Sequence, residues 1–350
     1  MMVNKKGSGA FGDVYQDGNV AVKKFSKQEF LVQEIIMMEY LKDSPYIVNS
    51  RGFSLSKLEI RMDLYDMCLR DLIKRYPLEN QHSRQIFKDI LCGLSSMHSL
   101  DLIHSDIKHS NILVTVVPLR AVLCDLGISS LGKYARFLQT PIGYRRPDHL
   151  LGNHLGERHD LYGLSVVGLE MFGDVWLDKQ VDPSRLQEII QEKVVDSQIR
   201  TVLIEFSKME SDIYPSARSV LMKVYKQDCV LVPPVIRRSP MRIAPEDDKY
   251  IHDVMQSYTK QMGINMGKRG YNLITERFNN PSYPIVDRKE YTFFISCVFL
   301  ILSAMFNNSE FTYREILMST KNTKTVEDID RVLTDIITKK ELRDILMMAE

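Results

Sequence analysis

Residues 104–111, with the sequence HSDIKHSN, bring three chemically useful side chains within six positions. The carboxylate of Asp106 can accept the proton of an attacking hydroxyl group. The ammonium group of Lys108 can neutralise charge on a phosphoryl group in transfer, and the amide oxygen of Asn111 can ligate Mg²⁺. Asp125, fourteen residues after Asn111, offers a second Mg²⁺ ligand. Because positioned charges and metal ions are the main means of catalysing phosphoryl transfer, this set predicts that chemistry.

A glycine-rich segment near the start of the chain has the pattern G-x-G-x-x-G-x-V, formed by Gly7, Ser8, Gly9, Gly12 and Val14. Glycines let backbone amides approach phosphate oxygens, because no side chain stands in the way. Dinucleotide-binding folds use similar glycines, but there the loop leads from a strand into a helix. Here the loop leads into another strand pattern, which favours a phosphate-binding hairpin.

Lys23 ends an apolar strand pattern of sequence VAVK. A lysine at a strand edge can simply extend its ammonium group into water. The alternative is a cation held near nucleotide phosphates, and such a lysine needs a carboxylate to orient it. Glu34, in the following helical pattern, is the candidate, and an ion pair between the two would tie that helix to the strand.

The elements around these residues follow a β-then-α order. Residues 1–25 indicate short strands with a hairpin turn at 17–19, and residues 28–42 repeat apolar side chains at helical spacing. Short strands return around 47–64, and helical patterns dominate from about 69 to 225. The sequence therefore predicts an α+β protein with a small β-rich lobe followed by a larger helical lobe.

Taken together, the ordered motifs resemble the protein kinase superfamily. The resemblance also includes 144–148 (YRRPD), 160–163 (DLYG) and 214–217 (YPSA), and it implies a bilobal catalytic domain over residues 1–226. It implies ATP and Mg²⁺ as cofactors and a protein as substrate. Lys108 is typical of the Ser/Thr kinases rather than the Tyr kinases. The ten residues between Lys23 and Glu34 are few, an economy that resembles kinases of large DNA viruses.

The resemblance implies a role for each matching residue. Asp106 is the expected catalytic base, Lys108 supports the transferred phosphate, and Asn111 and Asp125 hold Mg²⁺. Lys23, oriented by Glu34, is expected to hold the α- and β-phosphates. The residues expected around the adenine are Val14, Ala21 and Leu113, with Met62 as gatekeeper and Asp63, Leu64 and Tyr65 as the hinge.

One departure from the family concerns regulation. Ser105 stands where the family usually has an Arg before the catalytic Asp, and that Arg normally pairs with a phosphorylated activation segment. A phosphorylated activation segment would therefore lack its usual partner at position 105, and the sequence does not decide whether such phosphorylation controls activity.

Two other functions fit parts of the pattern. A pseudokinase-type scaffold would bind nucleotide and partners without catalysis, but such proteins usually lack at least one of the catalytic residues present here. A kinase acting on small molecules is disfavoured by segment 144–148, which resembles the family's support for peptide docking.

The remaining third of the chain has no chemical constellation. Residues 227–249 contain four prolines and predict a Pro-rich linker, and 250–350 predict a helical domain. Within it, 294–304 and 325–337 resemble cyclin-box helices, although Met305 stands where cyclins carry Lys; a generic helical extension is the alternative. A regulatory module within the chain is one expectation for this domain.

The last clear helix of this region begins with an approximate capping box, in which Thr325 and Asp328 can bond to each other's backbone. An apolar stripe is expected behind it, formed by Val326, Ile329, Leu333, Ile336 and Ile337.

Bulk composition narrows the partners and the compartment. The chain has 350 residues and a net charge of +1, so no nucleic-acid partner is expected. The apolar run at 293–306 is too short to span a bilayer comfortably and favours a buried helix, so no membrane partner is expected. The five cysteines are dispersed and odd in number, which predicts reduced thiols in an intracellular protein.

Overall fold

The computed structural model describes residues 4–9, 11–131, 141–147, 156–177, 179, 181–209, 214–229, 245–262, 271–272, 288–305, 313–320 and 324–338. Its strands are β1 (Asn4–Gly9), β2 (Gly12–Asp17), β3 (Val20–Phe25), β4 (Ser50–Ser54), β5 (Glu59–Asp63), β6 (Met67–Cys68), β7 (Leu102–Ile103), β8 (Ile112–Thr115), β9 (Arg120–Leu123) and β10 (Ser130–Leu131).

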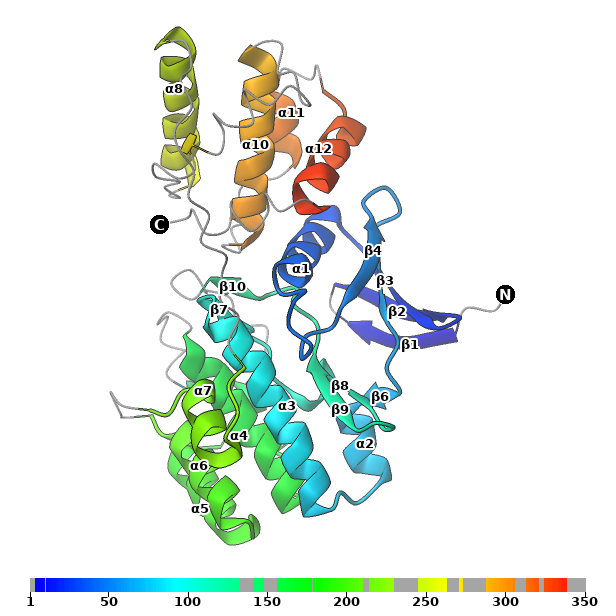
Figure 1. Cartoon of the computed structure of the whole chain (residues 1–350), viewed down its shortest axis with the longest axis vertical. Helices are drawn as coiled ribbons and strands as arrows, with labels where there is room; N and C mark the ends of the chain where they lie inside the picture. The colour runs from blue at the N-terminus through cyan, green and yellow to red at the C-terminus, as the bar shows by residue number, and fades with distance from the viewer. Residues whose placement is uncertain are drawn as a thin grey trace.

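The helices of the first two-thirds are α1 (Gln28–Tyr40), α2 (Leu69–Arg75), α3 (Asn80–His98), α4 (Glu157–Gly173), α5 (Pro183–Lys193), α6 (Ser197–Ser207) and α7 (Ala217–Val220). Shorter turns of helix are η1 (His109–Asn111), η3 (Ile142–Tyr144) and the π-helical η5 (Leu221–Tyr225). The C-terminal helices are α8 (Pro245–Met262), α10 (Arg288–Met305), α11 (Tyr313–Ser319) and α12 (Val326–Thr338). Figure 1 shows the β-rich lobe, the helical lobe and the C-terminal helices as three successive parts.

The N-terminal lobe is built on an antiparallel five-stranded sheet with the order β1-β2-β3-β5-β4. The hairpin turn expected at 17–19 joins β2 to β3, and Gly18 takes a φ of 61° there. That angle lies in the left-handed region, which glycine adopts without steric cost. The predicted β-then-α order and the bilobal α+β fold are confirmed.

Helix α1 carries Glu34 and is apolar on nearly every side, as its sequence QEFLVQEIIMMEY already indicates. All residues from 31 to 38 are buried. A helix that is apolar all round needs cover on both sides. The strands of the sheet contact one side of α1, and α10 and α12 contact it as well, so that α1 lies between them (Figure 1).

The helical lobe is organised around α3 and α4, whose central residues are almost all buried. The small sheet β6-β8-β9 and the pair β7-β10 lie at the end of this lobe that faces the N-terminal lobe (Figure 1). Leu123 of β9 exchanges backbone hydrogen bonds with the segment between α1 and β4, at Val48 (2.9 Å) and Tyr46 (2.9 Å). These bonds fix the register between the lobes next to the residues predicted to carry the chemistry.

The C-terminal region is helical, and its first helix begins at Pro245, five residues before the expected start of the helical domain. Proline is tolerated at the first position of a helix, where its missing N–H would have no partner within the helix. The apolar run predicted to form a buried helix lies in α10 as far as residue 305, and residue 306 lies outside the described residues. Within the part of the chain that the structure describes, no helix is long and apolar enough to cross a membrane.

Helix α12 begins with the predicted capping box. The Thr325 amide donates to the Asp328 carboxylate at 3.0 Å, and the Asp328 amide donates to the Thr325 hydroxyl at 3.2 Å. Ile329, Leu333 and Ile336 are fully buried as expected, but Val326 is 41% exposed. Val326 lies in the first turn, beyond the part of the helix that packs on its neighbours.

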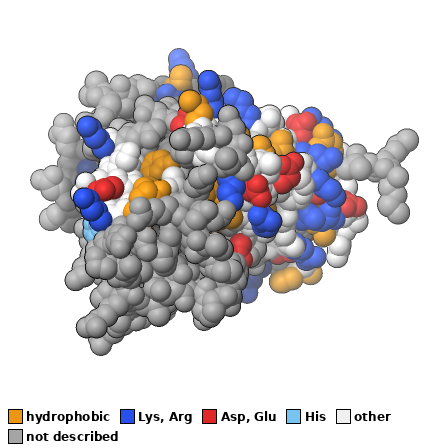
Figure 2. All heavy atoms as spheres, turned by 90° about the horizontal axis from the view of Figure 1, so that it is seen from above, with side chains coloured by type: hydrophobic (Ala, Val, Ile, Leu, Met, Phe, Trp, Pro, Cys, Tyr) orange, Lys and Arg blue, Asp and Glu red, His pale blue; other side chains and the backbone are white. Residues whose placement is uncertain are grey.

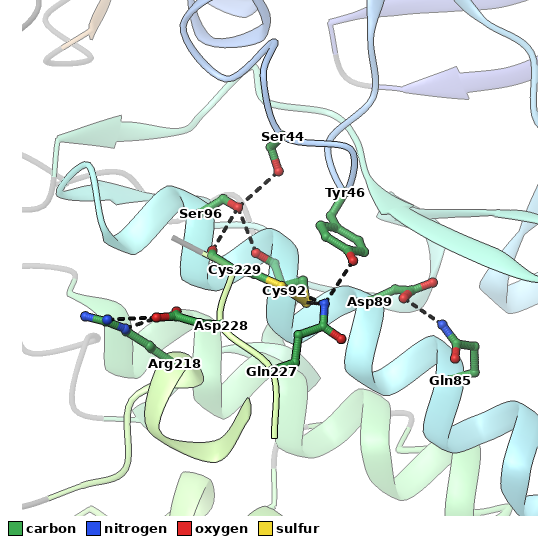
Figure 3. The surroundings of a disulfide bond; sticks show 10 residues. All are labelled: Ser44, Tyr46, Gln85, Asp89, Cys92, Ser96, Arg218, Gln227, Asp228 and Cys229. Carbon is green, nitrogen blue, oxygen red and sulfur yellow. Dashed lines mark hydrogen bonds and ion pairs between the residues drawn. A yellow bond between two sulfur atoms is a disulfide. The ribbon is translucent and has the colours of Figure 1, made fainter. Parts of the chain in front are cut away.

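The expectation of five reduced cysteines is wrong for one pair, because Cys92 of α3 and Cys229 form a disulfide across 137 residues (Figure 3). Ser96 donates to the Cys229 carbonyl at 3.2 Å, and Gln227 donates to the Tyr46 hydroxyl at 3.2 Å. The segment that leads to the linker is therefore fixed to α3. A separation this long leaves no local pattern in the sequence, so the spacing of the cysteines could not indicate the pair.

Figure 2 shows the end of the molecule that carries the C-terminal helices, with Lys and Arg next to Asp and Glu among the described residues. Charges of mixed sign steer charged partners less strongly than a patch of one sign. The described residues on this face therefore form no patch of one charge sign that would select a charged partner.

Candidate active site

Lys23 forms the centre of one half of the site. Its ammonium group lies 2.5 Å from the carboxylate of Glu34 on α1 and 2.7 Å from that of Asp125, which follows β9. Burial alone would lower the pKa of Lys23, but the charges of Glu34 and Asp125 and their hydrogen bonds raise it above its ordinary value. The predicted contact between strand and helix is therefore present, and it extends to the expected Mg²⁺ ligand.

This cluster holds one cation between two carboxylates. Burial and then the charge of nearby Asp125 raise the pKa of Glu34 to about 7, against the opposing effect of Lys23. Burial acts in the same direction on Asp125, but the Lys23 charge outweighs it and keeps the pKa of Asp125 below its ordinary value. Asp125 is therefore ionised at neutral pH. The pKa of Glu34, which is buried more deeply, lies close to neutral pH.

The other half of the site is the loop between β7 and η1. Lys108 donates to the Asp106 carboxylate at 2.6 Å, and the Asn111 amide donates to the same Oδ2 at 2.7 Å and to the Asp106 carbonyl at 3.0 Å. The other carboxylate oxygen of Asp106, Oδ1, is buried and accepts no hydrogen bond. The loop therefore holds Asp106 through Oδ2 and leaves Oδ1 without a hydrogen bond.

Asp160, at the start of α4, positions this loop and was not among the predicted site residues. Its fully buried carboxylate accepts the backbone amides of His104 and Ser105, both at 2.9 Å, and the side chain of His98 at 2.9 Å. Ser105 has a φ of 69°, which is costly for a residue other than glycine. Asp160 thus stabilises the strained turn that aims Asp106. The available sequence signal was the match of residues 160–163 (DLYG) to the family, which begins at Asp160.

The backbone joins the two halves. The Cys124 amide donates to the Asn111 carbonyl at 3.0 Å, and a ring nitrogen of His104 lies 3.1 Å from the Cys124 carbonyl. Asp125 follows at once, with a φ of 64° that turns it toward Lys23. Leu126, where the family usually has Phe, is fully buried and keeps the apolar contact.

The glycine-rich segment is the hairpin between β1 and β2. The Ser8 hydroxyl donates to Asp13 at 2.6 Å across this hairpin. A Cβ on Gly12 would lie 1.9 Å from the Lys24 carbonyl oxygen, so the sheet itself requires glycine there. A Cβ on Gly7 would meet nothing within 4 Å, and one on Gly9 would meet only the Gly12 carbonyl at 3.7 Å. The first two glycines are therefore not required by packing, which fits the role of leaving space for a phosphate.

The residues expected around the adenine lie on neighbouring strands. Ala21 of β3 pairs with Met62 of β5, and both side chains are buried. Val14 of β2 pairs with Lys23, and Leu113 lies on β8. The hinge residues Asp63, Leu64 and Tyr65 follow directly and connect the two lobes; all three side chains are partly buried.

The donor set fits Mg²⁺. Both hydrogen bonds of the Asn111 side chain use its nitrogen, so its Oδ1 is the atom suited to a metal ion, together with the carboxylate of Asp125. Among the described residues, no group of three or more His, Cys, Asp or Glu side chains could hold a metal by itself. Mg²⁺ in nucleotide sites is usually held by one or two side chains plus phosphates and water, which matches this sparse set.

Comparisons with known proteins agree with this geometry. The family model described as "Protein kinase domain" matches residues 2–233. The serine/threonine-protein kinase cst-1 of Caenorhabditis elegans is 29% identical over 189 residues, which is 49% of this chain and 37% of that protein. Shk1/pak1 of Schizosaccharomyces pombe, also a serine/threonine-protein kinase, is 30% identical over 186 residues, which is 48% of this chain and 28% of that protein.

A viral protein is among the similar sequences. The protein L670 of Acanthamoeba polyphaga mimivirus, whose name places it with the serine/threonine-protein kinases, is 23% identical over 246 residues. The match covers 65% of this chain and 45% of that protein. The chain thus spans less than half the length of each of these relatives. The family model ends at residue 233, so the C-terminal helices lie outside it and their likeness to a cyclin box stays a prediction.

Proposed function

This chain belongs to the protein kinase family, and from that premise we propose that it is an active Ser/Thr protein kinase that transfers the γ-phosphate of ATP to protein hydroxyl groups. The observation that carries the proposal is the completeness of the site. Lys23 contacts both Glu34 and Asp125, while Asp106, Lys108 and Asn111 form a second hydrogen-bonded group linked to it through the backbone.

Each side chain has a role that its geometry supports. Asp106, held by Lys108 and Asn111, accepts the proton of the substrate hydroxyl at its carboxylate. Lys108 lies next to that carboxylate and stabilises charge on the phosphoryl group in transfer. Lys23, oriented by Glu34, binds the α- and β-phosphates, and the amides of the hairpin at Gly7 and Gly9 approach the phosphate oxygens.

Asn111 and Asp125 would hold Mg²⁺, which neutralises phosphate charge when it is bound. The adenine would lie between Val14 and Ala21 on one side and Leu113 on the other. Met62 would line the back of this site, and the backbone of the hinge from Asp63 to Tyr65 would line its edge.

The alternative is a pseudokinase-type scaffold that binds nucleotide and engages partners through the C-terminal helices. The exposed apolar side chains Met318 (63%) and Val326 (41%) on those helices are the observation in its favour. The complete set of catalytic side chains favours the enzyme.

A transfer assay separates the two functions. We expect the purified chain to transfer the ATP γ-phosphate to Ser and Thr of at least one of two generic proteins, one acidic and one basic, and we expect Asp106→Ala to lower this rate roughly 10²- to 10⁴-fold while ATP binding stays intact. Glu192→Ala, at an exposed carboxylate on α5, is the matched control and should not change the rate. ATP binding without transfer by the wild-type chain would favour the scaffold instead.

The C-terminal helices are proposed to act as a regulatory module within the chain, whether or not they are cyclin-like. They contact α1, and the side-chain amide of Gln28 on α1 donates to the Asp330 carboxylate of α12 at 2.5 Å. Holding α1 in place keeps Glu34 on Lys23 without a phosphorylated activation segment, which agrees with Ser105 in place of the usual Arg.

We also propose an intracellular location, where ATP and protein substrates meet; the Cys92–Cys229 disulfide would there be subject to reduction.

The proposed regulatory role of the C-terminal helices can be tested at α12. Asp330→Arg is expected to lower the transfer rate roughly five- to tenfold, because it removes the contact with Gln28 and lets α1 shift relative to Lys23. Arg331→Glu, on the same turn but with a side chain that is 75% exposed, should leave the rate unchanged. Equal rates for Asp330→Arg and the wild-type chain would contradict the regulatory role.

A further inference from the structure

A pocket of about 1110 Å³ borders the catalytic loop and has no role in the function proposed so far. Lys108, His109 and Ser110 form part of its wall, and Lys108 also bonds to the Asp106 carboxylate at 2.6 Å. None of the residues predicted to bind ATP lines it. The pocket therefore lies one side chain away from the catalytic carboxylate, through Lys108, and outside the predicted nucleotide site.

The pocket's charged rim comes mainly from α2. Arg70, Lys74 and Arg75 all line the pocket and are exposed. Arg70 and Lys74 are four residues apart and so lie on the same face of the helix. Lys108 adds a fourth cation from the catalytic loop. Four positively charged side chains therefore line the pocket.

The floor of the pocket is aromatic and uncharged. The His109 ring lies 5.5 Å from the ring of Tyr144 and 5.3 Å from that of Trp176, and the Lys74 ammonium group lies 5.5 Å from the Trp176 ring. Burial, followed by the charges of Arg70, Lys74 and Lys108, lowers the pKa of His109 to about 4. His109 is therefore neutral at physiological pH.

Two carboxylates line the same pocket and only partly offset the cations. Glu170 is buried and accepts the Tyr144 hydroxyl at 2.6 Å, and burial raises its pKa to about 7, so it is partly protonated at neutral pH. Asp174 is exposed at the end of α4. Four cations therefore line the pocket together with one exposed carboxylate and one that is buried and near its titration point.

The size of the pocket favours a chain segment over a small molecule. Pockets for small ligands are usually about 300–1,000 Å³, and this one is larger. Its position beside Asp106 also means that a segment bound there can continue directly to a hydroxyl at the catalytic carboxylate. Charge complementarity then decides which segments bind.

We propose that this pocket, named the basic groove and defined by Arg70, Lys74, Arg75, Lys108 and Trp176, binds an acidic segment of the protein substrate. Asp and Glu side chains within a few residues of the phosphorylated Ser or Thr would contact the cations of α2. The enzyme then selects acidic substrate sequences over basic ones. This inference rests on the proposed kinase function.

Peptide kinetics test the groove. Two peptides carry one Ser each and differ only in flanking residues, which are Asp in one and Lys in the other. We expect the wild-type chain to phosphorylate the acidic peptide with a kcat/KM about tenfold higher. Exposed charge pairs each change an equilibrium by up to about fivefold, so Arg70→Glu with Lys74→Glu should lower the acidic-to-basic ratio by about tenfold or more. Arg70→Gln with Lys74→Gln should give an intermediate ratio.

The matched control is Arg185→Glu with Lys193→Glu, two reversals at exposed positions of α5 outside the groove, which should leave the ratio unchanged. An equal kcat/KM for both peptides, or a ratio that the α2 reversals do not change, would overturn the groove while leaving the kinase function intact. Transfer to neither peptide, and no transfer that depends on Asp106, would contradict the kinase function itself.

Discussion

Lys23→Met is expected to lower the free energy of unfolding by about 3–5 kcal/mol and to abolish phosphate transfer. The substitution keeps the length of the side chain but removes the cation that Glu34 and Asp125 share at 2.5 and 2.7 Å. The Glu34 side chain is only 2% exposed, so at pH 8, where the loss is measured, ionised Glu34 is left buried without a partner. Urea unfolding followed by circular dichroism measures the loss.

The double variant Lys23→Met with Glu34→Gln separates stability from catalysis. Removing the stranded charge should restore at least about half of the lost stability, because an uncharged amide is much less costly to bury. It should restore no activity, since the cation that binds phosphate is still missing. Lys24→Met, at the exposed neighbour on the same strand, is the matched control and should change stability by less than about 0.5 kcal/mol.

The effect of Lys23→Met should also depend on pH. The pKa of Glu34 in the folded protein is raised to about 7 from an ordinary value of 4.5, so its contribution to stability is present below pH 4.5 and is lost as pH rises through about 7. Without Lys23 this pKa rises further, and the variant then folds with Glu34 protonated at pH 6. The destabilisation should therefore be larger at pH 8 than at pH 6, and an equal loss at both values would contradict the assigned coupling.

Sequence patterns were sufficient to predict the parts of the site whose residues lie close together in the chain. Asp106, Lys108 and Asn111 lie within six residues, and the loop that holds them brings them into contact. The contact between Lys23 and Glu34 was also predictable, because a strand and the next helix along the chain usually pack together. The order of a β-rich lobe before a helical lobe, and the buried helix that contains most of the apolar run at 293–306, followed from periodicity and length.

Features that depend on distant parts of the chain could not be predicted in this way. The basic groove combines α2, the catalytic loop and the end of α4, which are separated by up to about a hundred residues. A C-terminal module that braces the helix of Glu34 could be suggested from the cyclin resemblance, but no local pattern marks the residues at which α10 and α12 contact α1. In each case the residues are of common types. Their role depends on which residues they contact in the folded protein, and no local sequence pattern specifies those contacts.

Asp160 is the strongest example of such a residue, and Asp160→Asn is expected to destabilise the protein by about 2–4 kcal/mol and to remove most activity. Each carboxylate oxygen accepts a buried backbone amide, at Ser105 and His104. An amide side chain has only one acceptor atom, so one of these donors would face an NH₂ group and stay unsatisfied. The strained φ of 69° at Ser105 would then relax and turn Asp106 away from the substrate hydroxyl.

The pH dependence of Asp160→Asn provides a second test of the same mechanism. Although burial opposes ionisation, the hydrogen bond from His98 keeps the pKa of Asp160 below its ordinary value of 3.8. Its contribution is thus present above pH 3.8 and lost as pH falls further, so the difference between wild type and variant should be constant from about pH 7 to 5 and narrow in stronger acid. Asp182→Asn, at an exposed N-cap on α5, should change stability by only a few tenths of a kcal/mol, because Asn caps helices as well as Asp. A cost for Asp160→Asn as small as that of Asp182→Asn would show that the catalytic loop keeps its shape without Asp160.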